Sequence, residues 1–371
     1  MGDGVRYRAR RGADPLRFFS VEEVERARRY NRPLYRAGAA DVALAAGVLA
    51  VLVWTDAGIA LDPGSLPWWG RTLAYTAIVV ATSAAVRTPL AFWSGYIRER
   101  RWRFSTQRPR GWMADRGKAV AVNVALSSAL LLGLVALTRT LPGWWVVPAA
   151  AALALAALVL SFLAPVLLAP LFNRYSPLRD TPLAAELRAL AQAAGVPVQD
   201  VLVEDTSRRT RRANAYVAGL GRTRRIVVSD TLLAEASPAE VRVVVAHGGH
   251  RRSRHVLLAT LVAMAGAIVA MIVVWALLGT HAADPHRIPL VLLVGLGLGL
   301  TPAPAFAALS RRWERAADRY SLELTNDRAA YRTVFLRLAR TNLSDLDPPP
   351  LLYLLLFTHP TPPDRLVAAA T

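Results

Sequence analysis

Two histidines separated by two glycines stand in the segment EVRVVVAHGGHRRSRHV at residues 240–256. On an α-helix, residues three apart are separated by roughly 300° of rotation, so His247 and His250 would share one face. Imidazole is the commonest metal ligand among side chains, and the pair therefore indicates a candidate metal site. The spacing also arises by chance, and each glycine weakens a helix by about 1 kcal/mol relative to alanine. The segment alone leaves three alternatives open: a damaged zinc site, a different metal site or no site.

The spacing differs by one residue from the zinc-site motif H-E-x-x-H, in which the glutamate activates water. His247 and His250 are three residues apart rather than four, and a glycine follows His247. The change shortens the histidine separation along a helix by about 1.5 Å and rotates it by about 100°. Zinc requires its nitrogen ligands at roughly 2.0–2.1 Å, so we expect a metal site of this kind to be weakened.

The residues before the histidines carry the signals of a helix start. Ser237 suits the N-cap, Pro238 suits the first helical position, and Glu240 stands where a capping box places its glutamate. The sequence therefore predicts that the histidines lie on a helix, and that this helix continues into the apolar segment that begins near residue 256.

Two carboxylates follow the last long apolar segment, in SRRWERAADRYSL at residues 310–322. Glu314 and Asp318 are four residues apart and would share one helix face. A carboxylate on a second helix often completes a zinc ligand set, and a nearby acid often orients a ligating histidine. The alternative is a solvated helix face, in which Glu314 pairs with Arg311 and Asp318 with Arg315.

The composition excludes an ordinary soluble protein. The chain has 371 residues, is 54% hydrophobic and contains no cysteine, which rules out disulfides and thiol chemistry. Its apolar residues gather in six segments long enough to cross a bilayer, which takes about 20 residues. These segments are residues 39–60, 72–95, 119–137, 144–168, 256–278 and 288–309.

The formal charge of +19 is carried mainly by arginine, and the arginines favour one side of the predicted membrane. They are dense before the first span, between the second and third, between the fourth and fifth and after the sixth, and sparse in the other loops. This alternation predicts that both termini are cytoplasmic. We therefore interpret the positive charge as a signal that sets the membrane topology and as a source of attraction to anionic lipid, rather than as a nucleic-acid-binding feature. Arg87 within the second span requires a watery chamber or a partner such as Asp41.

The region 173–255 is the largest polar piece. Residues 181–196 have apolar residues at helical spacing and end near Gly195, a plausible C-cap. Residues 198–207 and 213–233 alternate or run apolar and predict strands of a small sheet. The predicted organisation is a basic arm at 1–37, four spans within 38–172, a cytoplasmic α+β region at 173–255, two spans within 256–309 and a cytoplasmic C-terminal region at 310–371.

The chain resembles the integral-membrane zinc metallopeptidases of the CAAX prenyl protease type I family. FSVEEVERARRYNR is similar to the family's N-terminal arm, and LAPLFNRYSPL to its segment leaving a membrane helix. SRRTRRANAYVAGLGRTRRIVVSDTLL is similar to its strand pair, including Asn-Ala-Tyr. AHGGH stands where the family has A-H-E-x-G-H, ERAAD matches E-x-x-A-D, and HPTPPDRL matches its C-terminal H-P…R-L. The motifs occur in the family's order over most of the chain.

The resemblance implies a mostly α polytopic membrane protein of about six transmembrane helices, which enclose a chamber beside a zincin-like α+β region. It implies one Zn²⁺ per chain and the following residue roles. The metal ligands are His247, His250 and Glu314, with Asp318 supporting a ligand; Asn214, Ala215 and Tyr216 form an edge strand for an extended substrate; and His359 and Arg365 stabilise the oxyanion of the tetrahedral intermediate.

The implied function is cleavage of peptides or protein tails at a cytoplasm-facing chamber by a monomer in a bacterial plasma membrane. The missing general base predicts impaired hydrolysis, because such groups contribute roughly 10²–10⁴-fold. The alternative is an inactive relative that binds polypeptides as a scaffold or quality-control partner. A transporter would also fit six spans, but it would leave the region 173–255 and the ordered motifs unexplained.

Overall fold

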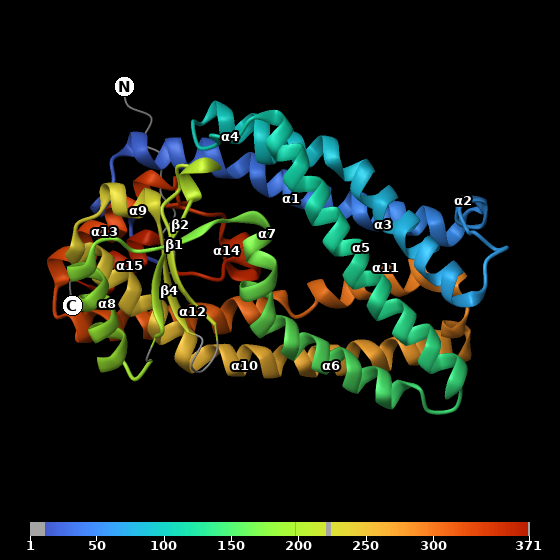
Figure 1. Cartoon of the computed structure of the whole chain (residues 1–371). Helices are drawn as coiled ribbons and strands as arrows, with labels where there is room; N and C mark the ends of the chain where they lie inside the picture. Colours follow the sequence, from blue (N-terminus) through green and yellow to red (C-terminus); the bar gives the residue numbers. More distant parts are fainter. Residues whose placement is uncertain (1–11, 197, 220–223, 370–371) are drawn as a thin grey trace, which may run out of the picture.

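A computed structural model describes residues 12–196, 198–219 and 224–369, apart from the side chains of 162–163, 165–166 and 250–256. Long helices run side by side and form an elongated bundle, and a small sheet with shorter helices occupies one end of it (Figure 1). The start of the described chain lies at this sheet end beside the last helix, where the Ala13 amide donates to Asp364 Oδ1 at 2.8 Å. The mostly α fold with a small α+β region confirms the predicted fold class.

Among the described residues, seven helices of 13 residues or more build the bundle. They are α1 (Val21–Trp54), α3 (Trp68–Phe92), α5 (Pro109–Thr140), α6 (Val146–Leu163), α10 (Pro238–Leu278), α11 (Ile288–Leu300) and α12 (Ala303–Thr325). Among the described residues, four helical segments are long and apolar enough to cross a membrane by themselves. They are Val21–Trp54, Trp68–Arg101, Pro109–Thr140 and Leu257–Ala283. These correspond to the first, second, third and fifth predicted spans.

The fourth and sixth predicted spans take less regular forms. The apolar part of α6, Val146–Ser161, is shorter than the other spans, and a π-helical turn at Ala164–Leu168 leads from α6 to α7 (Ala169–Phe172). The sixth span is a bent pair, with 42° between Pro285–Leu300 and Ala303–Thr325. Pro302 stands at the bend, where a proline lacks the N–H that a continuous helix needs.

Three helices cross the boundaries that the sequence predicts between membrane and cytoplasmic parts. The part of the N-terminal arm that follows Ser20 forms one helix, α1, with the first span, and a capping box at Ser20 and Glu23 starts this helix. In the same way α10 carries both the histidine segment and the fifth span, and α12 continues past residue 310. Rigid helices therefore connect the sheet end to the membrane spans.

The sheet has the order β1-β2-β4-β3 and is mixed. Its strands are β1 (Tyr175–Pro177), β2 (Asp200–Glu204), β3 (Ala215–Ala218) and β4 (Arg225–Ser229). β2 and β4 are parallel, with Val201 opposite Ile226, whereas β3 is antiparallel to β4 and forms an edge. The predicted strands are confirmed over these ranges, but residues 230–233 at the end of the predicted strand segment are helical and belong to Asp230–Glu235. β1 lies in a segment for which the sequence predicts no strand.

Shorter helices surround this sheet. They are α8 (Thr181–Ala193), α9 (Asp230–Glu235), α13 (Arg328–Thr341), α14 (Pro350–Leu356) and α15 (Pro362–Ala368). α2 (Asp56–Ala60) lies at the opposite end of the bundle, and α4 (Arg98–Arg101) follows α3. Gly195 has φ +67°, the left-handed conformation expected of the residue after a helix.

The sheet end and the bundle have separate hydrophobic cores. The first gathers fully buried side chains of α1, α8, β4, α9 and α13: Val24, Leu187, Ile226, Val228, Leu232 and Tyr331. The second lies between the spans around Tyr75, Val79 and Trp145.

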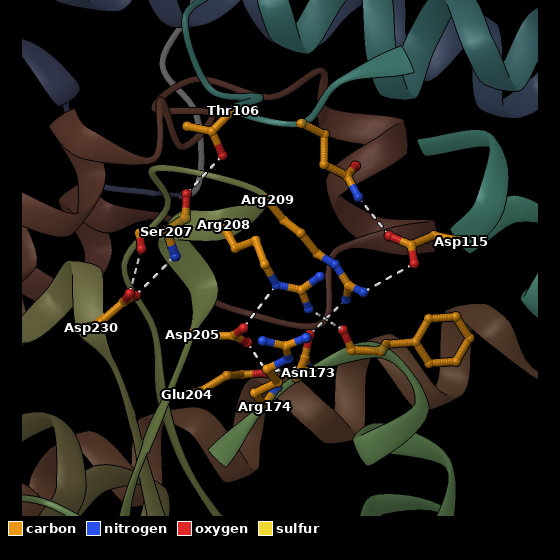
Figure 2. Close-up of polar contacts among 12 residues, drawn as sticks. Thr106, Asp115, Asn173, Arg174, Glu204, Asp205, Ser207, Arg208, Arg209 and Asp230 are labelled. Atoms are coloured by element: carbon orange, nitrogen blue, oxygen red, sulfur yellow. Dashed lines mark hydrogen bonds and ion pairs between the residues drawn. The ribbon is translucent and has the colours of Figure 1, made fainter. Parts of the chain in front are cut away.

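A polar junction connects the loop after α4 to the sheet end (Figure 2). Thr106 donates its hydroxyl to the carbonyl of Ser207 at 2.8 Å. Arg209 reaches Asp115 on α5 at 3.1 Å and Asn173 after α7 at 2.7 Å. One arginine thus holds together segments from three parts of the chain.

The N-terminal cap of α10 fixes the helix that carries His247. The Ser237 hydroxyl accepts from the Glu240 amide at 3.3 Å, and Glu240 accepts from the Ser237 amide at 2.7 Å. We predict that Ser237→Ala lowers the free energy of unfolding by about 0.5–2 kcal/mol, because the Glu240 amide loses its acceptor. Thermal unfolding in detergent measures the change. Ser237→Asp retains an acceptor and should unfold close to the parent; equal losses in both variants would contradict the assignment.

Candidate metal centre

The histidine segment of α10 lies directly against the edge strand of the sheet. A Cβ built on Gly248 would stand 3.7 Å from the Tyr216 Cα and 3.9 Å from the Val217 amide nitrogen. These are ordinary van der Waals distances, so a Cβ at residue 248 would fit, and the α10 backbone passes close to strand β3 at this point. The adjacent His247 side chain is only 13% exposed.

The ring of His247 lies between the two carboxylates of α12. Its Nε2 is 3.1 Å from Glu314 Oε2, and its Nδ1 is 3.1 Å from Asp318 Oδ1. Both carboxylates are buried, with Glu314 at 0% and Asp318 at 2% exposure. The structure thus brings together three of the predicted site residues, and each ring nitrogen faces a different acid.

The burial of these acids excludes the alternative of a solvated helix face. Arg311 turns away from the carboxylates and donates to the carbonyls of Tyr353 at 2.9 Å and Phe357 at 2.5 Å. Arg315 is exposed on α12. The proposed pairing of Glu314 and Asp318 with these arginines on an exposed face is therefore wrong.

Arg365 of α15 closes the site behind Asp318. Its Nε donates to both carboxylate oxygens of Asp318 at 3.0 and 3.1 Å, and its Nη2 also contacts this carboxylate. The guanidinium lies 3.9 Å from the ring centre of Phe335 on α13. Arg365 therefore neutralises Asp318 and packs on an aromatic face.

His359 contacts the other side of Glu314. Its Nδ1 lies 3.0 Å from Glu314 Oε2, and its side chain is 51% exposed. Of the described residues in contact with the two acids, His359 is the most open to solvent. It is therefore placed where a ligand in the site would meet it, whereas Arg365 is only 13% exposed.

The contacts of His247 favour a cation beside its ring. A neutral imidazole has one N–H, so it can donate to only one of the two carboxylates that face it. With Nδ1–H directed to Asp318, a proton or a metal ion is needed between Nε2 and Glu314. Burial and the charge of Arg365 lower the pKa of His247, and the contacts with Asp318 and Glu314 outweigh both, so the pKa is raised.

A histidine nitrogen and a carboxylate oxygen are ligands that zinc accepts, and an acid behind the histidine is the usual support. His247, Glu314 and Asp318 fit these roles. His250 stands on α10 one turn further on, but its side chain is outside the described residues. Among the residues that the structure describes, no group of three or more His, Asp or Glu side chains is arranged to hold a metal ion.

The predicted substrate strand occupies the sheet edge beside His247. Ala215 and Tyr216 are in β3, and Asn214 precedes it with an exposed side chain. The Ser229 amide donates to the Asn214 carbonyl at 2.9 Å, so these two residues form a hydrogen-bonded pair across the ladder. Since such pairs alternate, the backbone groups of Ala215 and Val217 point away from β4.

Two aromatic residues of α13 belong to the site and carry no sequence signal beyond helical apolar spacing. Phe335 contacts Arg365 and lies 6.2 Å from the His247 ring, centre to centre. Tyr331 is fully buried, and burial together with the charge of Asp318 raises its pKa. These side chains exclude water from the inner face of the site.

Comparison with known proteins gives two matching family models that together cover most of the chain. Residues 177–371 match peptidase family M48, and residues 13–174 match the CAAX prenyl protease N-terminal region, described as five membrane helices. The two matches meet after α7, which is where the membrane helices of the N-terminal half give way to β1.

Individual relatives agree with these matches. An uncharacterized metalloprotease, YhfN, of Bacillus subtilis is 30% identical over 80% of this chain and 72% of its own length. A CAAX prenyl protease 1 homolog of Arabidopsis thaliana is 27% identical over 80% of this chain and 73% of its own. CAAX prenyl protease 1 of Saccharomyces cerevisiae is 28% identical over 50% of this chain and 42% of its own.

The fold has a counterpart among solved structures. The crystal structure of S. mikatae Ste24p superimposes with a TM-score of 0.78 over 95% of this chain and 89% of that one, at 22% sequence identity. The structural similarity shows that the two proteins share a fold, and the family matches show to which family this chain is related. The chain belongs to the M48 metallopeptidase family, in the branch of multi-pass membrane proteins that carry the CAAX prenyl protease N-terminal helices.

Proposed function

We propose that this chain is a zinc metalloendopeptidase with strongly reduced hydrolytic activity, which receives peptides or protein tails at a cytoplasm-facing chamber. The observation that carries the proposal is the array of Asp318, His247 and Glu314, which retains the donors for a metal although the segment lacks the glutamate of H-E-x-x-H. We further propose that the chain acts as a monomer in a bacterial plasma membrane with both termini in the cytoplasm.

In this proposal His247, His250 and Glu314 hold zinc, which when bound supplies a Lewis acid that polarises the scissile carbonyl. Asp318 accepts the Nδ1 proton of His247 and fixes the ring, while Arg365 keeps Asp318 ionised. His359, exposed beside Glu314, is placed to donate a hydrogen bond to negative charge that develops on a substrate oxygen. The substrate backbone pairs with the edge of β3 at Ala215 and Val217.

The reduced activity follows from the residue after His247. Glycine at 248 provides no base to take a proton from water or to return it to the leaving amine. Glu240 is engaged in the α10 capping box and contacts Arg337 at 3.2 Å. Both acids near His247 are already engaged, one by Arg365 and the other by two histidines.

The first test of this proposed function concerns the metal content of the purified chain. We expect the detergent-purified chain to bind one zinc ion with weakened affinity and His250→Ala and Glu314→Gln to lose it, because each removes a proposed ligand. Zinc per chain is measured by mass spectrometry during titration with a chelator. His281→Ala, in the turn after α10, should retain the parent's zinc. A parent without zinc would contradict the metal site and leave the chain as an inactive relative.

The second prediction concerns the missing base. Insertion of glutamate between His247 and Gly248 produces His-Glu-Gly-Gly-His and restores both spacing and base. We expect chelator-sensitive peptide cleavage to rise by roughly 10²–10⁴-fold. Insertion of glutamine at the same place restores spacing alone and should leave cleavage near the parent level. Equal gains from both insertions would show that spacing, rather than the base, limits the activity.

The alternative function is a polypeptide-binding scaffold without hydrolysis, which the position of β3 at the edge of the sheet favours. Both functions predict that Ala215→Pro weakens capture of an extended peptide by at least about tenfold. The proline removes an outward N–H at an edge, where proline is tolerated by the fold. Fluorescence anisotropy of a labelled peptide measures the effect, with Ala215→Gly as the control that keeps the N–H. Unchanged peptide affinity in Ala215→Pro would exclude pairing at this edge.

A further inference from the structure

A cavity of about 790 Å³ lies among the membrane helices α1, α3, α5, α6, α10 and α11. Its volume is in the range of sites that hold one small ligand, roughly 300–1,000 Å³. Most of its lining is alanine, valine and leucine, but it also contains two arginines. No role proposed above for the metal centre uses these arginines.

The polar lining gathers at one end. Ser83 and Arg87 stand one turn apart on α3, while Arg116, Asn123 and Ser127 follow one another along one face of α5. Both arginines are thus at the end of their helices that is nearer the loop joining α4 to α5. This loop contacts the sheet end, which the arginine distribution places in the cytoplasm.

The rest of the lining is apolar. Further along α5 the cavity is lined by Leu134 and Leu137, and α10 adds Met271 and Val274. At 1.5 Å per residue, Arg116 and Leu134 are separated by about 27 Å along the α5 axis. This separation exceeds the hydrocarbon thickness of one leaflet, which is about 15 Å in a bilayer core of about 30 Å. The cavity therefore has a cationic end and a long apolar end.

Of the two arginines, Arg87 forms an ion pair with a carboxylate in the described part of the chain. Arg87 Nε donates to Asp41 Oδ1 at 2.8 Å, and its Nη2 also contacts this acid, which is not in the cavity lining. Arg116 has no carboxylate within ion-pair distance among the described residues, and its buried Nε lacks a hydrogen-bond acceptor there.

The acid next to Arg116 in sequence is committed elsewhere. Asp115 accepts from Arg209 at 3.1 Å and from Gln107 at 2.5 Å, and both contacts lie at the polar junction (Figure 2). The cationic end of the cavity therefore carries a net positive charge.

A charge in the hydrocarbon region is costly unless it is paired or solvated. Basic pockets between membrane helices on the cytoplasmic side commonly bind anionic lipid headgroups. We propose that the cavity binds one anionic membrane lipid, with its phosphate at Arg116 and Arg87 and an acyl chain along α5 toward Leu134. A free anion would leave the long apolar end unfilled, and the cavity lining offers polar side chains for a peptide backbone only in the half near Arg116.

Native mass spectrometry of the whole chain in nonionic detergent tests the proposal. The probes are lyso-phosphatidylglycerol and lyso-phosphatidylcholine with the same acyl chain, and inorganic phosphate alone. We expect one tightly bound lyso-phosphatidylglycerol per chain and weaker lyso-phosphatidylcholine. Arg116→Gln should reduce the preference for the anionic lipid by about tenfold, which corresponds to about 1.4 kcal/mol. Arg110→Gln, in the exposed first turn of α5 and outside the cavity, is the matched control.

A second pair of variants tests the acyl chain. A Cβ on Gly133 would meet nothing within 4 Å, and this residue lines the cavity, so Gly133→Leu should fill the apolar end and reduce binding of both lysolipids. Gly117→Leu, equally unobstructed on α5 but outside the cavity, should leave binding unchanged. Three outcomes would each overturn the proposal. The parent could bind the two lysolipids with equal affinity, or binding could be unaffected by both Arg116→Gln and Gly133→Leu. A peptide could also be recovered from the protein instead of a lipid.

Discussion

The buried contact between the α10 histidine and the α12 carboxylates is the constraint on which the site depends. Asp318 and Glu314 are withdrawn from water, and a buried acid is costly unless cations or hydrogen bonds compensate it. Arg365, His247 and His359 provide that compensation from α15, α10 and the segment before α15. The side chains of Asp318 and Glu314 therefore connect α12 with α10, with α15 and with the segment before α15.

Long helices transmit this arrangement into the membrane. α10 contains both His247 and the fifth span, and α12 contains both acids and continues the bent sixth span. A shift of either helix within the bundle would move one side of the site relative to the other. The polar junction around Arg209 and the capping box of α10 limit such shifts at the sheet end.

The glycine after His247 lies where α10 passes strand β3. A Cβ at residue 248 would meet the Tyr216 backbone at an ordinary van der Waals distance, so this approach does not require glycine. Glycine at this position places no carboxylate directly after His247, where the motif H-E-x-x-H has its glutamate. The described part of the site therefore keeps the ring of His247 between two buried carboxylates.

The sequence by itself determined the membrane location, the helical class, the strands β2, β3 and β4, and the helix start at Ser237. Each of these follows from local signals, namely apolar length, alternation and capping residues, which do not need the rest of the fold. The ordered motifs also identified the family.

Only the tertiary structure decided how the sixth span bends, that β1 joins the sheet, and that Glu314 and Asp318 are buried. The exposure of these two acids depends on which helices cover them. The residues that contact them are distant in sequence: His247 stands 71 positions before Asp318. The same holds for Phe335 behind Arg365, and for Arg116, whose buried Nε has no hydrogen-bond acceptor in the described part of the chain. Pairings of this kind are non-local, so the neighbouring residues in the sequence do not specify them.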